Sequence, residues 1–196
     1  MSGRRQNAAQ QQPYSFPASA SAYTFTVPRT GKWKFVAWGP GGNGGLGSSG
    51  ASGAYVEVTR QLQRNATVTI TVGRVAVSDT TIVFPNGYTV TAGRATTSTA
   101  GTATNGDVNL NGSAGGLTGA VNGTAGSGTG GGAGGATNGG LAGGSGAPAN
   151  LPYRGGEGVA GGVNGVVGIG SGGPETAGTA ERGGCGFALA VCLKAS

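Results

Sequence analysis

The acidic residues are the side chains whose types could support acid–base catalysis, and the sequence has only six of them. It contains no histidine, so the most common general base and zinc ligand is missing. Glycoside hydrolysis needs two carboxylates within about 10 Å of each other. The closest pair in sequence, Glu175 and Glu181, lies in a loop-like context, and we interpret all the acids as solvated charges. These are Glu57, Asp79, Asp107, Glu157, Glu175 and Glu181. We predict that the chain is not an enzyme and holds no cofactor or metal.

A glycine motif at residues 39–44, Gly-Pro-Gly-Gly-Asn-Gly, has the G-x-G-x-x-G spacing of dinucleotide-binding turns. Dinucleotide binding requires a helix directly after the motif, because the helix N-terminus holds the pyrophosphate. Residues 45–50 show no helical pattern, and the sequence has no G-K-[ST] motif of a phosphate-binding loop. We therefore expect no nucleotide site.

Two tryptophans and two cysteines could make specific contacts or bonds. Trp33 and Trp38 are five residues apart on one predicted strand and therefore point to opposite faces. Core packing is the default for both, and Trp38 is our candidate interface contact, together with Tyr153 and Arg154.

Cys185 and Cys192 lie seven residues apart on the last predicted strand, which is about 23 Å and too far for a disulfide between them. We interpret both as small buried residues. An intersubunit disulfide is the alternative.

The composition is dominated by glycine, with 46 Gly among 196 residues and a net charge of +6. The basic residues are mostly single and spread along the chain. This indicates a soluble surface with a mild positive bias, or weak attraction to an anionic partner, and no specific nucleic-acid site. No run of 18 apolar residues and no apolar leader occur, so we expect neither membrane insertion nor a secretory signal. Two cysteines without a signal indicate synthesis in a reducing compartment.

Period-two alternation predicts an all-β unit of five or six short strands over residues 23–100. β-Branched and aromatic residues alternate with Thr and other polar residues over residues 23–27, 32–38, 55–60 and 67–72. Asn86-Gly87 between two further β-rich runs is a strong hairpin signal. Alternation over residues 186–194 predicts a final strand, within a segment 185–196 that returns to the β unit.

Residues 101–184 consist mainly of Gly, Ala, Asn, Thr and Ser, and many of the glycines fall on a three-residue lattice. Gly41, Gly44, Gly47, Gly50 and Gly53 repeat the same period. Polyproline-II-type helices have three residues per turn, so such a lattice lines one edge without side chains and lets neighbouring helices approach. We predict a glycine-rich bundle of polyglycine-II type inserted into a β-sandwich. The alternative is a flexible linker.

Residues 1–22 are polar, rich in Gln, Ala and Ser, and interrupted by Pro13 and Pro17. Alone they bury too little apolar area to offset their ordering entropy. They are either a disordered tail or a flexible arm that becomes ordered on a partner, with Tyr14 and Phe16 as anchors.

The order of these features resembles the glycine-rich domain of tailed-bacteriophage virion proteins of the tail fibre, adhesin and spike type. Segments 23–28 (YTFTVP), 31–45 (GKWKFVAWGPGGNGG), 52–58 (SGAYVEV), 68–73 (VTITVG) and 183–191 (GGCGFALAV) carry the resemblance, which spans about residues 23–193. The chain departs from that pattern at 74–77, where a glycine run is usual, and at Cys185, where a polar residue is usual.

The resemblance implies a virion structural protein, made in the host cytoplasm, that contacts the host surface through a polysaccharide or an outer-membrane protein. Residues 1–22 would then dock to other virion proteins, with Arg4, Arg5, Tyr14 and Phe16 as docking residues. We expect a homotrimer, because the glycine-rich part buries little apolar area within one chain. The alternatives are a capsid head decoration protein and a non-viral glycine-rich module that binds ice or polysaccharide.

Overall fold

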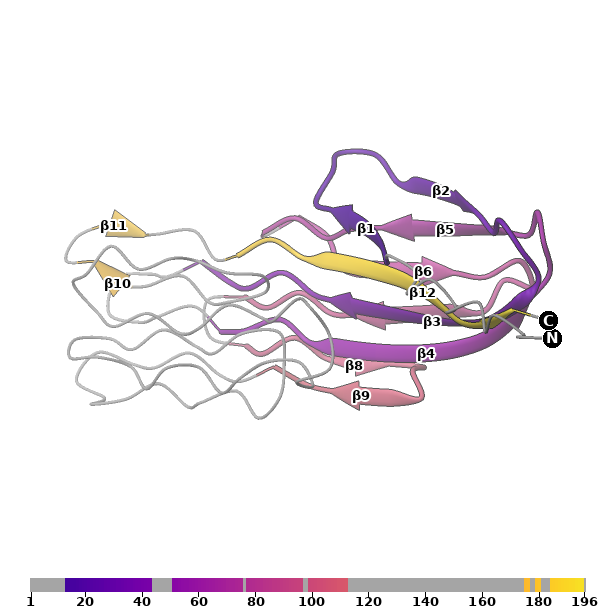
Figure 1. Cartoon of the computed structure of the whole chain (residues 1–196). Coiled ribbons are helices and arrows are strands. Elements are labelled where there is room, and N and C mark those ends of the chain that lie inside the picture. The colour runs from indigo at the N-terminus through magenta and orange to yellow at the C-terminus, as the bar shows by residue number, and fades with distance from the viewer. Residues whose placement is uncertain are drawn as a thin grey trace, which may run out of the picture.

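The computed structural model describes residues 13–43, 51–75, 77–96, 99–112, 175–176, 179–180 and 184–195. These residues form twelve β-strands and no helix (Figure 1). The strands are β1 (Tyr14–Pro17), β2 (Tyr23–Thr26), β3 (Gly31–Trp38), β4 (Tyr55–Leu62), β5 (Thr67–Thr71), β6 (Thr80–Val83), β7 (Thr89–Ala92), β8 (Ala103–Thr104), β9 (Val108–Leu110), β10 (Glu175–Thr176), β11 (Thr179–Ala180) and β12 (Phe187–Ala195). The predicted all-β fold is therefore confirmed. The described residues include no helix of membrane-spanning length.

Two antiparallel five-stranded sheets pack face to face. Sheet A has the order β1-β12-β3-β4-β9, and sheet B has the order β2-β5-β6-β7-β8. β12 lies between β1 and β3, so the last strand returns to the sheet as predicted. β10 and β11 form a separate two-stranded pair.

The apolar side chains that alternate along the strands of both sheets pack between the sheets and form the core. On β3, Trp33 and Phe35 point inward, where they meet Phe25 of β2 and Phe84 after β6. Ring centroids in this network lie 5.3–5.5 Å apart at steep angles, a favourable geometry for aromatic pairs. Valines and isoleucines of β4, β5, β6 and β7 fill the rest of the core.

The outer face of sheet A carries a second apolar cluster. Val36, Trp38, Tyr55 and Leu189 are almost inaccessible to solvent and pack together there. A sandwich strand usually presents polar residues on this side. β3 instead buries both of its faces over its second half, which explains its nearly continuous apolar sequence from Phe35 to Trp38.

The sandwich has two different ends. At one end, which we call the turn end, lie the turns at residues 28–30, 63–66 and 84–88, and β12 finishes beside the start of β3. At the other, which we call the glycine end, lie residues 39–43, 51–54, 93–96, 101–102, 111–112 and 184–186, joined by backbone hydrogen bonds. Figure 1 shows β3 and β4 running the length of the body between these two ends.

Glycines at the glycine end let backbone lie directly against backbone. A Cβ on Gly53 would lie 2.1 Å from the carbonyl oxygen of Gly39, and one on Gly39 would lie 2.0 Å from that of Gly93. Hydrogen bonds cross between the sheets here, from the Ala54 N–H to the Gly93 oxygen (3.0 Å) and from the Ala95 N–H to the Pro40 oxygen (2.9 Å). The two sheets therefore converge at this end without intervening side chains.

Two predicted boundaries need correction. Residues 14–17 form β1, which pairs with β12, so the chain belongs to sheet A from Tyr14 onward and the predicted arm 1–22 is too long. β8 and β9 pair with β7 and β4, so the sandwich continues to about residue 110 and not to 100. The predicted polyglycine-II bundle lies almost entirely outside the described residues.

We expect Phe16→Ala to lower the free energy of unfolding by about 3 kcal/mol, because a buried phenyl ring is lost from the core. Phe16 is 8 % exposed and packs on Tyr23 and Phe25 at 5.4 and 5.7 Å between centroids. Urea unfolding followed by tryptophan fluorescence measures the loss, with exposed Ser15→Ala as the control. Equal stability of wild type and Phe16→Ala would contradict the assignment of β1 to the sandwich.

Gly53→Ala should destabilise the protein by about 2 kcal/mol or more, because the new methyl group meets backbone atoms that cannot rotate away. Thr102→Ala, an exposed position in the same region, is the matched control and should change little. Thermal unfolding by circular dichroism compares the two. An unchanged midpoint for Gly53→Ala would show that the close backbone packing is absent.

Candidate functional site

The predicted site residues do not come together in the described part of the chain. Arg4, Arg5, Tyr153 and Arg154 lie outside the described residues. Tyr14 is 46 % exposed at the edge of sheet A.

Of the two proposed docking anchors, only Tyr14 is accessible. Its ring rests on Phe25 and Trp33, with centroids 5.0 and 6.1 Å away. Phe16 points into the core, so its predicted role as a docking anchor is wrong in this structure.

Trp38 is also not an exposed contact. The two tryptophans do point to opposite faces of β3, as predicted, but Trp38 is 0 % exposed within the outer cluster. Its ring packs on Tyr55 at 5.3 Å and on Phe187 at 6.1 Å. The outer face of sheet A is itself apolar, so burial on that side overrides the expected contact role.

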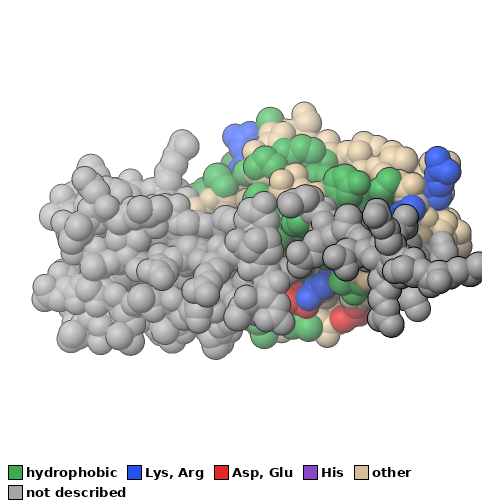
Figure 2. Space-filling view, in the orientation of Figure 1, with side chains coloured by type: hydrophobic (Ala, Val, Ile, Leu, Met, Phe, Trp, Pro, Cys, Tyr) green, Lys and Arg blue, Asp and Glu red, His purple; other side chains and the backbone are tan. Residues whose placement is uncertain are grey.

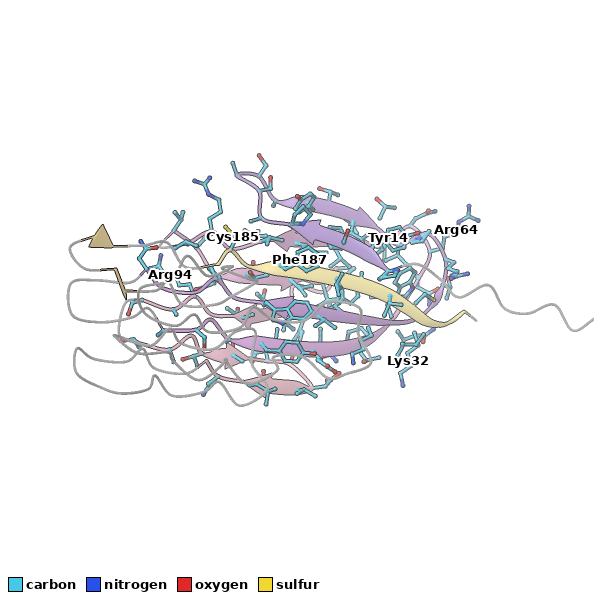
Figure 3. All side chains as sticks on the ribbon, turned by 60° about the vertical axis from the view of Figure 1, so that its left-hand side comes forward. Tyr14, Lys32, Arg64, Arg94, Cys185 and Phe187 are labelled. Atoms are coloured by element: carbon cyan, nitrogen blue, oxygen red, sulfur yellow. The ribbon has the colours of Figure 1, made fainter. Side chains whose placement is uncertain are left out.

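The cysteines differ from their predicted burial. Cys185 is exposed and Cys192 is partly buried against the core, and both are free thiols. Cys185 lies at the glycine end between Gly184 and Gly186, whose backbone groups bond to Gly41 and Gly73, and its own side chain is exposed (Figure 3).

Glu57 was predicted to be a solvated charge, but it is buried. Its carboxylate pairs with the Lys34 ammonium (Nζ–Oε2 2.5 Å) and accepts a hydrogen bond from the Tyr55 hydroxyl. Burial, and then the carboxylate of Glu57, raise the pKa of Tyr55 far above its usual value. The phenol therefore stays protonated and acts only as a donor. Lys34, Tyr55 and Glu57 therefore lie beside the apolar outer cluster with their polar atoms paired to one another.

A pocket of about 270 Å³ opens at the turn end, between the end of β4 and the β6–β7 turn. It is lined by Arg60, Gln61, Leu62, Gln63, Ala66, Phe84, Pro85 and Asn86. Two turns hold its rim together: the Thr30 hydroxyl donates to Gln63 Oε1 (3.3 Å), and the Arg64 N–H donates to Thr30 Oγ1 (2.9 Å).

Arg60 occupies a core-facing position of β4, on the same side of the strand as Val56, Val58 and Leu62. A charge on this face needs partners. Its Nη1 donates to Asp107 Oδ1 (3.0 Å) and to the Thr59 carbonyl (2.8 Å). The guanidinium also lies 4.8 Å from the centroid of the Tyr88 ring. Arg60 is therefore held in one orientation beside the pocket.

Asp107 is held mainly by the backbone. The Thr59 N–H donates to its Oδ2 (2.6 Å), and Arg60 pairs with the other oxygen. The Thr59 hydrogen bond is the main cause that lowers the pKa of Asp107, and Arg60 adds to it. This carboxylate stays ionised and fixes the arginine.

Further basic residues lie at the turn end. Arg64 follows Gln63 directly, Lys32 pairs in register with Gln61, and Arg29 precedes Thr30 in the adjoining turn. Figure 2 shows blue side chains at the right-hand end of the body, and Figure 3 shows Lys32 and Arg64 on opposite edges of the same end, away from Arg94. Within the described residues, no three of Asp, Glu or Cys gather as a metal site.

Comparison of the chain with protein-family models, curated proteins and solved structures found no match. The turn-end pocket was not predicted from the sequence. The available signal was Arg60 itself, an arginine within the Val56-x-Val58-x-Arg60-x-Leu62 alternation.

Asp107→Asn should lower stability at neutral pH by less than about 1 kcal/mol, because the ion pair is exposed and screened. The folded-state pKa lies below the ordinary 3.8, so the carboxylate stabilises the fold above that pH. This contribution is lost as the pH falls through the folded-state pKa. Wild type and variant should therefore converge in acid.

Urea unfolding at a series of pH values from neutral to acidic measures this convergence. A difference between wild type and Asp107→Asn that stays constant across the series would contradict the assignment.

Proposed function

We propose that the chain is a structural protein of a bacteriophage virion, a tail fibre or spike component that contacts the host surface without catalysis. The observation that carries the proposal is the division of the sandwich into a turn end and a glycine end. Much of the glycine lies in segments 44–50 and 113–174, and the residues that directly precede them, Asn43 and Gly112, lie at the glycine end. β12 finishes at the turn end, and β1 starts from that side. A body with this polarity suits a protein that is anchored at one end and presents the other.

The segments that carry the phage resemblance also support the proposal. They fall on β2, β3, β4, β5 and β12, which are adjacent strands of the two sheets and not scattered surface pieces. The glycines of the "GPGG" and "SGA" segments lie in the backbone contact at the glycine end. The resemblance therefore concerns residues that build the body.

A binding role fits the polar chemistry better than a catalytic one. Glu57 and Asp107 are both engaged in ion pairs with neighbouring cations. Neither is free to donate or accept a proton at a substrate. The proposal includes a homotrimer and a host polysaccharide or outer-membrane protein as partners.

Immunogold electron microscopy with an antibody against this chain tests the proposal on purified phage particles. Label at the tail end is the expected result. Label over the head would replace the proposal with a decoration role, and absence of label from particles would overturn the virion assignment. Pre-immune serum serves as the control.

A further inference from the structure

We propose that the turn-end pocket binds a carboxylate side chain from an acidic segment of a partner protein. This deepens the proposed function by naming the chemistry of a partner at the turn end, which we take as the anchored end because β1 starts from that side. It rests on that function only for the statement that the partner is another virion protein. The site itself rests on the polar atoms that line the pocket.

The pocket presents hydrogen-bond donors whose matching acceptors are already occupied. Asn86 Oδ1 accepts from the Tyr88 N–H (3.1 Å), which leaves the Nδ2 group to donate. Gln63 Oε1 accepts from the Thr30 hydroxyl (3.3 Å), which leaves its Nε2 group to donate. Arg60 uses Nη1 for both of its hydrogen bonds within the described residues, so Nε and Nη2 remain for a ligand. Such a set fits an acceptor, and an oxyanion best.

The surrounding charge favours an anionic partner. Arg29, Lys32 and Arg64 belong to the turn end of the body, where the pocket opens, and Asp107 is the acid that pairs with Arg60. Asp107 carries one negative charge and pairs with Arg60, so it leaves the charges of Arg29, Lys32 and Arg64 uncompensated. Clustered charge of one sign raises the association rate of an oppositely charged segment and orients it.

The shape of the pocket favours a protein carboxylate over a sugar or a nucleic acid. Phe84 is only 4 % exposed, and one face of Tyr88 carries the Arg60 guanidinium. Tyr88 is 38 % exposed but does not line the pocket, so within the pocket a base or a sugar ring finds little aromatic face on which to stack. The apolar wall of Leu62, Phe84 and Pro85 suits the methylene groups of a glutamate side chain, and the volume suits one such side chain.

Asn86→Asp and Gln63→Glu test the site with almost no change of shape. Each variant keeps the oxygen that accepts the native hydrogen bond and replaces the free amide donor with a carboxylate oxygen. We expect full-length wild-type protein to bind a fluorescein-labelled glutamate octapeptide, measured by fluorescence anisotropy at low salt. Each variant should weaken this binding about tenfold or more, because a donor is lost and a like charge is added.

Ser21→Asp is the matched control. It adds the same charge at an exposed position between β1 and β2, on the side of the glycine end. It should change the affinity less than about twofold if the pocket and not the net charge governs binding. Thermal unfolding of all variants verifies that they are folded.

Several results would overturn the proposal. One is that the glutamate octapeptide binds no more tightly than a glutamine octapeptide. Another is that Ser21→Asp and Asn86→Asp lose affinity for the glutamate octapeptide equally. Tighter Asn86-dependent binding of a hyaluronan oligosaccharide or an oligothymidylate would assign the pocket to a different class of ligand. If Asn86→Asp and Gln63→Glu alone lose peptide binding while the immunogold label lies only on the head, the binding site stands and the tail assignment is rejected.

Discussion

Direct contact between the backbones of the two sheets is the constraint on which this body depends. Sheets in a sandwich ordinarily stand about 10 Å apart, separated by side chains. At the glycine end the Ala54 N–H instead reaches the Gly93 oxygen, and the Ala95 N–H reaches the Pro40 oxygen. Such bonds form only where glycines remove the Cβ atoms that would lie in the contact. Glycine here is a packing requirement, and it fixes the position from which segments 44–50 and 113–174 depart.

At the turn end, large aromatic side chains keep the two sheets apart. Phe25, Trp33, Phe35 and Phe84 separate the sheets and make edge-to-face contacts with one another. β1 adds Phe16 to this network, and the Tyr23 hydroxyl donates to the Pro17 oxygen (2.9 Å). The large side chains therefore hold the turns in place, and these turns carry the polar groups of the pocket.

The alternation of apolar and polar residues predicts most of the sandwich, because a strand with one buried face carries an apolar residue at every second position. It predicts β2, β3, β4, β5 and β12, and Asn86-Gly87 predicts the β6–β7 turn, where Gly87 has φ 80°. β1 escapes prediction because Phe16 is its single buried residue and Pro17 is unusual within a strand. Its partner β12 lies at the far end of the sequence, so no local pattern signals the pairing.

The pocket escapes prediction because its members belong to separate strands and turns. Arg60, Tyr88 and Asp107 are each an ordinary residue in its own segment, and only the register of the sheets brings them together. One signal was nevertheless local. An arginine at a core-facing position must be neutralised or solvated, so the alternation around Arg60 requires a counter-charge and an opening to water nearby. Asp107 supplies the first and the pocket supplies the second. The pattern that predicts β4 therefore also indicates where its core face opens to solvent.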